Sequence, residues 1–210
     1  MVHMTLSAIQ CKTLQCLRRN RSPRSWLAGS VLLHQYLSRP IGDIDIHHAQ
    51  TPEWIRAVEA DCALLESKGY VMARRIDHDF EMEARLLLGN DEILINWVLA
   101  REPRYFAHTE NGPFGTSLHV CDAILEKIRM AFHGESCKHF EDLSLCANAG
   151  LLFSEFVDIV ASEDDASPAL FRSAFETNIR RSPLLRKRDL YAATPADVRA
   201  TLSKSGARLP

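Results

Sequence analysis

The chain has 210 residues, of which 46% are hydrophobic and 25% are charged, and its formal net charge is −2. This composition excludes an intrinsically disordered chain and is sufficient for one large domain or two small ones. A net charge so close to zero excludes general attraction to nucleic acid. No apolar run reaches the ~18 residues of a membrane span, and the N-terminal segment lacks the features of a signal peptide. We therefore expect a cytoplasmic protein that does not enter a membrane.

The first elements predicted along the chain are a helix, a short strand and a second helix. Residues 5–19 have the pattern of an amphipathic helix, and the stretch SWLAG at 25–29 predicts a strand. Residues 30–37 predict a helix with Ser30 as its N-cap. The Gly-Ser pair at 29–30 is therefore expected at a turn from a strand into a helix.

The next elements are a strand, a long helix and a hairpin. The stretch DIDIH at 43–47 alternates as a strand does. Residues 51–69 predict a helix with Thr51 at the N-cap, a proline in the first helical position and a glycine past the end. Residues 80–99 predict a hairpin, because apolar residues alternate on both sides of the turn sequence GND.

The segment REPRYFAHTENGPFGTS at 101–117 contains the proline, glycine and asparagine residues of a loop. Beyond it the sequence has helical periods and no convincing strand. We therefore predict an α/β (α+β) fold, in which a small mixed-sheet domain at 1–104 is followed by a helical domain at 118–210.

Two aspartates in the predicted strand require a compensating charge. Because side chains alternate along a strand, Asp43 and Asp45 share one face while Ile44 and Ile46 share the other. An unpaired buried carboxylate costs several kcal/mol or takes up a proton. A divalent metal is the leading candidate, and Mg²⁺ needs only one or two carboxylates when phosphate oxygens complete its coordination.

The Gly-Ser pair suits the phosphates of a nucleoside triphosphate. Twelve residues separate Ser30 from Asp43. A glycine such as Gly29 lets the backbone approach a ligand closely. A hydroxyl and free N–H groups at the start of a helix suit an anionic phosphate. Gly29 and Ser30 are therefore predicted to bind nucleotide.

The segment GSVLLHQYLSRPIGDID resembles the nucleotidyltransferase superfamily that includes polymerase beta, and within it the AbiEii/AbiGii toxin-like branch. The later segment DAILEKIRMAFHGESCKHFEDL, residues 122–143, follows the spacing of that branch's helical signature. Lys127 falls on the family lysine, Lys138 on the usual arginine, and Asp142 with Leu143 on the closing pair. Residues 150–210 match nothing beyond a general helical character.

The resemblance implies a toxin-like, Mg²⁺-dependent transfer of a nucleotidyl group from a nucleoside triphosphate to a hydroxyl. The two aspartates of the Asp-Ile-Asp would hold the metal, and the Gly-Ser pair would cradle the phosphates. Lys127 would neutralise charge on the triphosphate or the leaving pyrophosphate, and Asp142 would orient Lys127 or contact the nucleotide. RNA such as a tRNA end is the favoured acceptor, and an antitoxin-like protein is a candidate partner.

Two departures from the family pattern leave an alternative open. Asn96 occupies the slot of a third carboxylate, although Glu92 or Glu83 could supply the missing charge, and His139 replaces an aspartate of the helical signature. An amide is a poorer Mg²⁺ ligand than a carboxylate and cannot act as a base. The alternative is a degenerate relative that binds nucleotide, RNA or a protein partner without transfer.

Individual site residues also have simpler interpretations. Lys127 could be an exposed helix lysine, and Asp142 could serve only to stabilise a helix N-terminus. A plain structural α/β domain is a third reading of the chain, but it leaves the paired aspartates unexplained.

Two basic clusters could follow a phosphate backbone. Without interleaved aromatic residues, each can equally be a solvated helix face. The first comprises Lys12, Arg18, Arg19, Arg21 and Arg24, and the second comprises Arg180, Arg181, Arg186, Lys187 and Arg188.

Overall fold

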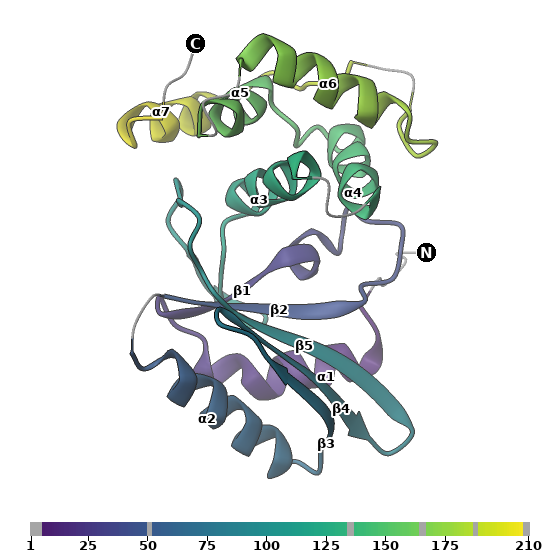
Figure 1. The fold of residues 1–210 in the computed structure, drawn as a ribbon, viewed down its shortest axis with the longest axis vertical. Helices are drawn as coiled ribbons and strands as arrows, with labels where there is room; N and C mark the ends of the chain where they lie inside the picture. Colours follow the sequence, from purple (N-terminus) through teal and green to yellow (C-terminus); the bar gives the residue numbers. More distant parts are fainter. Residues whose placement is uncertain (1–5, 50–51, 134–136, 164–166, 187–188, 208–210) are drawn as a thin grey trace. The chain divides into compact units, whose positions relative to one another are not determined.

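The structure is a computed structural model that describes residues 6–49, 52–133, 137–163, 167–186 and 189–207. The chain divides into two compact units (Figure 1). Unit 1 comprises residues 1–103 and 107–119, and unit 2 comprises residues 104–106 and 120–210. Unit 1 contains a seven-stranded mixed sheet with helices, and the regular elements described in unit 2 are helices. The predicted α/β (α+β) class is therefore confirmed.

Unit 1 is built around a sheet with the strand order β3-β4-β5-β2-β1-β7-β6. Strand β2 runs parallel to β5, and β1 runs parallel to β7, whereas the other neighbours are antiparallel. Its elements are α1 (Ala8–Leu17), η1 (Arg18–Asn20), β1 (Ser25–Ala28), η2 (Gly29–Leu33), β2 (Asp43–His48), α2 (Trp54–Glu66), β3 (Val71–Asp77), β4 (Glu81–Leu88), β5 (Asp91–Leu99), β6 (Thr109–Gly112) and β7 (Gly115–Ser117).

One face of the central strands is apolar and the other is polar. Ile44 and Ile46 of β2 and Ile95 and Trp97 of β5 are fully buried. Helices α1 and α2 lie along one face of the sheet (Figure 1), and Trp97 donates a hydrogen bond to a residue of α2. Because strand residues alternate, the polar residues between these apolar ones lie on the face opposite α2.

The segment before β2 is fixed by the start of α1. Ser7 and Gln10 form a capping box, in which each side chain satisfies the other residue's backbone N–H. The Gln10 side chain then donates to the backbone carbonyl of Ile41 at 2.8 Å. Helix α1 therefore holds the chain two residues before β2 begins.

Two predicted helices differ from the observed ones. The helix predicted at 30–37 is the short 3-10 helix η2, whose N-cap is Ala28 and not Ser30. Only a turn follows at 34–36, so the segment is too short for a stable α-helix. Helix α2 has Glu53 at its N-cap, and Thr51 lies outside the described residues.

The loop predicted at 101–117 is wrong in its second half. Strands β6 and β7 form a hairpin there, and β7 pairs with β1 through Leu27 and Ser117. These strands are short and rich in glycine and polar residues, so they lack the alternation that marks a strand. The pairing with β1 assigns residues 107–119 to unit 1 and extends the sheet.

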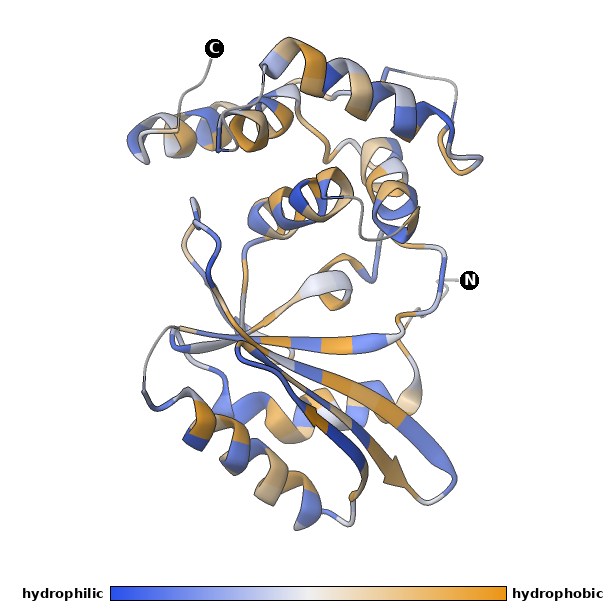
Figure 2. Cartoon of the chain, in the orientation of Figure 1, coloured by the Kyte–Doolittle hydropathy of each residue, from blue (hydrophilic) through white to orange (hydrophobic). Residues whose placement is uncertain are grey.

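Unit 2 packs amphipathic helices around a core that includes Leu125, Leu143, Phe156 and Ile179, all fully buried. Figure 2 shows hydrophobic and hydrophilic residues alternating along these helices. No helix among the described residues is long and apolar enough to cross a membrane. The helices are α3 (Val120–Phe132), α4 (Cys137–Asn148), α5 (Ser154–Glu163), α6 (Pro168–Arg180) and α7 (Ala196–Lys204).

A buried carboxylate joins three elements of unit 1. Asp61 of α2 forms a salt bridge of 2.5 Å with Arg21, which follows η1. Asp61 also accepts hydrogen bonds from Asn20 of η1 at 2.8 Å and from the indole N–H of Trp97 in β5 at 2.9 Å. Burial lowers the pKa of Arg21, while the charge of Asp61 and its hydrogen bond act in the opposite direction. Arg21 is therefore a core residue and not part of a solvated basic face.

Replacing Asp61 by asparagine is expected to destabilise the protein by about 3 kcal/mol, because the buried Arg21 charge loses its partner. The measurement is the free energy of unfolding in urea. Asp77→Asn is the matched control, since the Arg75–Asp77 pair is largely exposed and such pairs contribute less than about 1 kcal/mol. An equal loss of unfolding free energy in the two variants would contradict the conclusion that Asp61 joins α2, η1 and β5.

Candidate functional site

The polar face of the sheet brings two aspartates and an asparagine together. Asp45 of β2 lies directly opposite Asn96 of β5, and Asp43 lies two residues earlier on the same face. The Asn96 Nδ2 group donates to Asp45 Oδ1 at 3.1 Å and to Asp43 Oδ2 at 3.5 Å. Both aspartates are half-buried. They are therefore accessible enough to bind a ligand, and an amide lies beside them.

The amide of Asn96 attracts the two aspartates, whereas a carboxylate at this position would repel them. A carboxylate at this position would add a third negative charge beside Asp43 and Asp45, whereas an amide donates hydrogen bonds to both. Asn96 is buried, and its Oδ1 atom has no hydrogen-bond partner among the described residues. Rotation of the amide by half a turn would direct this oxygen, which can act as a metal ligand, toward the two carboxylates.

A glycine is required where β1 meets η2. Gly29 has φ +65°, a conformation that L side chains rarely adopt, and a Cβ atom there would lie 1.8 Å from Asp45 Oδ2. The backbone of the Gly-Ser turn therefore approaches the Asp45 carboxylate directly. A side chain at residue 29 would both strain the backbone and displace Asp45.

Arg39 is a residue of this site that our sequence analysis did not identify. Its guanidinium donates to Ser30 Oγ at 3.3 Å and to the carbonyl oxygen of Pro40 at 3.1 Å. A cation thus lies against the hydroxyl of the Gly-Ser turn, where it suits an anionic ligand. The signal in the sequence was an arginine four residues before Asp43, but spacing alone does not show that it reaches back to Ser30.

The two glutamates considered as a third carboxylate lie in different places. Glu83 of β4 is opposite Asn96 in the sheet and is half-buried. Glu92 lies toward the turn end of the β4–β5 hairpin and forms an exposed salt bridge of 3.4 Å with Arg85. Glu92 therefore lies away from Asn96 and pairs with Arg85 instead. Among the described residues, no group of three His, Cys, Asp or Glu side chains is arranged to hold a metal ion.

In unit 2, Lys127 of α3 and Asp142 of α4 form a buried ion pair. The Lys127 Nζ group donates to Asp142 Oδ2 at 2.7 Å, and both residues are buried. The interpretation of Lys127 as an exposed helix lysine is therefore wrong. Asp142 lies five residues into α4 and contacts Lys127, so stabilising a helix N-terminus does not explain it.

The other residues of the helical signature differ in environment. Asp122, near the start of α3, accepts the backbone N–H groups of Tyr105 and Phe106 at 3.0 and 3.1 Å. It therefore ties residues 104–106 to α3. Lys138 is exposed, and His139 is half-buried.

No protein-family model matches the chain, and no curated protein matches it. Two solved structures have a similar fold. The first is a "putative nucleotidyltransferase from H. pylori", with a TM-score of 0.50, 16% identity, and coverage of 87% of this chain and 88% of that chain. The second is JHP933 from Helicobacter pylori, with a TM-score of 0.50, 17% identity, and coverage of 88% and 87%. At these identities the similarity establishes a nucleotidyltransferase-like fold.

Replacing Gly29 by alanine is expected to destabilise the protein, because the left-handed backbone conformation alone costs about 1–2 kcal/mol and the Cβ atom collides with Asp45. The measurement is the free energy of unfolding. Gly42→Ala is the control, since a Cβ atom at Gly42 meets nothing within 4 Å. The cost of Gly29→Ala should fall in an Asp45→Ala background, and an unchanged cost would refute the close approach.

Proposed function

We propose that the protein is a nucleotidyltransferase that moves a nucleotidyl group from a nucleoside triphosphate to a hydroxyl acceptor. The observation that carries this proposal is the Gly29 backbone lying against the Asp45 carboxylate, with Asp43 on the same face of β2. Two carboxylates beside a turn that suits phosphate are the groups that phosphoryl chemistry needs for positioning and for charge neutralisation. The nucleotidyltransferase-like fold supports the same activity.

The residues of the site are compatible with Mg²⁺ when a triphosphate is present. Asp43 and Asp45 would hold the ion, and phosphate oxygens would supply further ligands, so a third carboxylate is not required for binding. When bound, Mg²⁺ neutralises phosphate charge and favours departure of pyrophosphate. The Oδ1 atom of Asn96, which has no hydrogen-bond partner among the described residues, would be a neutral third protein ligand to the ion after rotation of the amide.

The phosphates would be bound mainly by residues of unit 1. The backbone N–H groups of the turn at Gly29 and the Ser30 hydroxyl would donate hydrogen bonds to phosphate oxygens. Arg39, which already contacts Ser30 Oγ, would add positive charge and reduce the repulsion between the triphosphate and the two aspartates. We assign Arg39 to the proposed nucleotide site for this reason.

Lys127 would supply a second cation for the triphosphate or for the leaving pyrophosphate. Its ammonium is held by Asp142, so its side chain is ordered before any ligand binds. Asp142 is in this proposal a positioning residue.

The site has no obvious base for proton transfer from the attacking hydroxyl at the position of the third carboxylate. Asn96 is neutral and cannot accept a proton, so Asp43 or Asp45 would have to do so. A degenerate relative that binds nucleotide, RNA or a protein partner without transfer is therefore the second candidate function. The specific observation in its favour is that Asn96 donates hydrogen bonds to both aspartates where the family has a third carboxylate.

We extend the proposal to the acceptor of the nucleotidyl group and to a protein partner. The resemblance to the AbiEii/AbiGii toxin-like branch favours RNA, such as a tRNA end, as the acceptor and an antitoxin-like protein as a partner. Among the predicted basic residues, Arg180, Arg181 and Arg186 are exposed, and Lys187 and Arg188 lie outside the described residues. Exposed arginines are suited to a phosphate backbone.

Incubation with labelled nucleoside triphosphates, Mg²⁺ and total RNA is expected to transfer label to RNA, and Asp43→Asn is expected to reduce transfer at least about 100-fold. Asp43→Asn should also weaken nucleotide binding in Mg²⁺ but not in chelator, because it removes a metal ligand. Asp91→Asn is the control, since Asp91 is exposed at the end of the hairpin.

The outcomes of this experiment separate the two candidate functions. Nucleotide binding that depends on Asp43 and Mg²⁺, without transfer of label, would favour the degenerate relative. Equal nucleotide binding and equal transfer in Asp43→Asn and Asp91→Asn would contradict the proposed nucleotidyltransferase, because Asp43 would then take no part in binding the metal and the nucleotide.

Replacing Asn96 by aspartate is expected to lower stability in chelator by roughly 1.4 kcal/mol, the equivalent of one pKa unit of repulsion. Mg²⁺ should restore the stability, and any transferase activity should rise. The measurement is the melting temperature with chelator and with Mg²⁺. Asn178→Asp adds the same charge on exposed α6 and should not respond to Mg²⁺. If Asn96→Asp is equally indifferent, residue 96 lies outside the metal site.

A further inference from the structure

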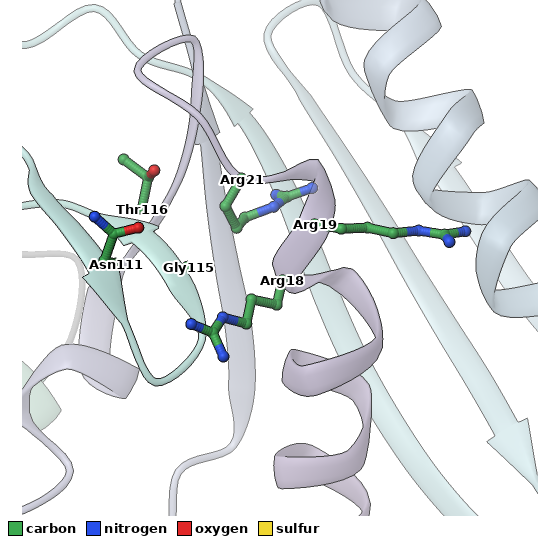
Figure 3. A pocket seen from close by; sticks show the side chains of 6 residues that line it. All are labelled: Arg18, Arg19, Arg21, Asn111, Gly115 and Thr116. Atoms are coloured by element: carbon green, nitrogen blue, oxygen red, sulfur yellow. The ribbon is translucent and has the colours of Figure 1, made fainter.

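Unit 1 contains a pocket that is separate from the residues of the proposed nucleotide site. Its volume is about 300 Å³, near the lower limit for small-ligand pockets. We call it the arginine pocket (Figure 3). It is lined by Arg18, Arg19, Arg21, Asn111, Gly115 and Thr116.

The arginine pocket is strongly basic. Three arginines line it and no acidic residue does. The charge of Arg21 is balanced by Asp61, whereas Arg18 and Arg19 form no ion pair with any described residue. Both guanidinium charges are therefore uncompensated, and that of Arg18, which is directed toward Asn111 (Figure 3), favours an anionic ligand in the pocket.

Unused hydrogen-bond donors point to the same class of ligand. The guanidinium of Arg21 points away from Asn111 and Thr116 (Figure 3) and is paired with Asp61, so Arg21 is not counted among the donors available to a ligand. The side chains of Asn111 and Thr116 form no hydrogen bond within the described part of the chain. Figure 3 shows the guanidinium of Arg18 directed toward Asn111, while the side chain of Arg19 points away. Arg18, Asn111 and Thr116 are thus the groups most available to a ligand.

The walls of the pocket depend on a close approach of β7 to η1. Gly115 has φ +94°, and a Cβ atom there would lie 2.7 Å from the Arg18 carbonyl oxygen and 2.8 Å from Arg21 Cβ. Asn111, in β6, has φ 58°, a conformation that asparagine tolerates better than most residues. The β6–β7 hairpin is therefore shaped to lie directly against the arginines that follow α1.

We propose that the arginine pocket binds a phosphate group. The forked donors of an arginine match phosphate oxygens, and a hydroxyl and an amide supply the neutral donors that commonly complete such a site. The phosphate can belong to a phosphodiester of single-stranded RNA or to a small phosphate such as a free nucleotide. Both sources share the chemistry that the pocket recognises.

The site does not depend on the proposed catalytic activity, because none of its six residues belongs to the proposed nucleotide site. Strand β1 nevertheless connects the two regions. It pairs with β7 through Leu27 and Ser117, and its last residue, Ala28, pairs with Asp45. Phosphate bound in the arginine pocket would therefore lie on the opposite side of β1 from β2.

The test uses the full chain with two probes, a 3′-labelled single-stranded RNA 12-mer and inorganic phosphate. Arg18→Gln is expected to weaken RNA binding at least about 10-fold and to lower the slope of log affinity against log salt by about 0.7. Thr116→Val, which removes only the hydroxyl, should weaken binding without changing that slope. Binding of inorganic phosphate alone that is lost in Arg18→Gln would identify a small phosphate as the ligand, whereas Arg18-dependent binding of RNA without measurable binding of inorganic phosphate would identify the phosphodiester.

Arg24→Gln is the matched control, because Arg24 is exposed in the same basic cluster and does not line the pocket. It should change affinity less than about 2-fold. Equal effects of Arg18→Gln and Arg24→Gln on both probes would overturn the proposal, since binding would then reflect net charge alone. Binding should persist in Asp43→Asn, and its loss there would also overturn the proposal by assigning the phosphate to the aspartates.

Discussion

The buried carboxylate of Asp61 determines how the parts of unit 1 fit together. It joins α2 to Arg21 after η1 and to Trp97 of β5. Trp97 is the neighbour of Asn96, so fixing the indole on the α2 side directs the Asn96 amide to the opposite face. Arg21 in turn packs against the position of Gly115. One buried interaction therefore helps to position both the aspartate site and the arginine pocket.

The aspartate site brings two like charges close together on one face of the sheet. The amide of Asn96 donates to both Asp43 and Asp45, and the bare backbone at Gly29 leaves room for the Asp45 carboxylate. The amide of Asn96 therefore reduces the repulsion between the two carboxylates. Asn96 stabilises the two aspartates, but its amide cannot accept a proton from an attacking hydroxyl.

The sequence predicted those features that depend on local periodicity. The alternation of residues 43–47 correctly assigned Ile44 and Ile46 to the core, and the β4–β5 hairpin is present as predicted. The β6–β7 hairpin, the burial of Arg21 and the contact of Arg39 with Ser30 could not be predicted in this way. Each depends on a partner distant in sequence or on the path of an irregular segment, and charged residues alone suggest a solvated surface.

The register of the sheet limits which group can replace the missing carboxylate. Asp45, Asn96 and Glu83 lie in one row across β2, β5 and β4. Adjacent strands are about 4.8 Å apart, so the backbones at Asp45 and Glu83 are separated by about 10 Å. Two oxygens that share one Mg²⁺ at about 2.1 Å lie at most about 4.2 Å apart. Glu83 could therefore reach the proposed Mg²⁺ only over Asn96, so the proposed function assigns metal binding and proton transfer to Asp43 and Asp45.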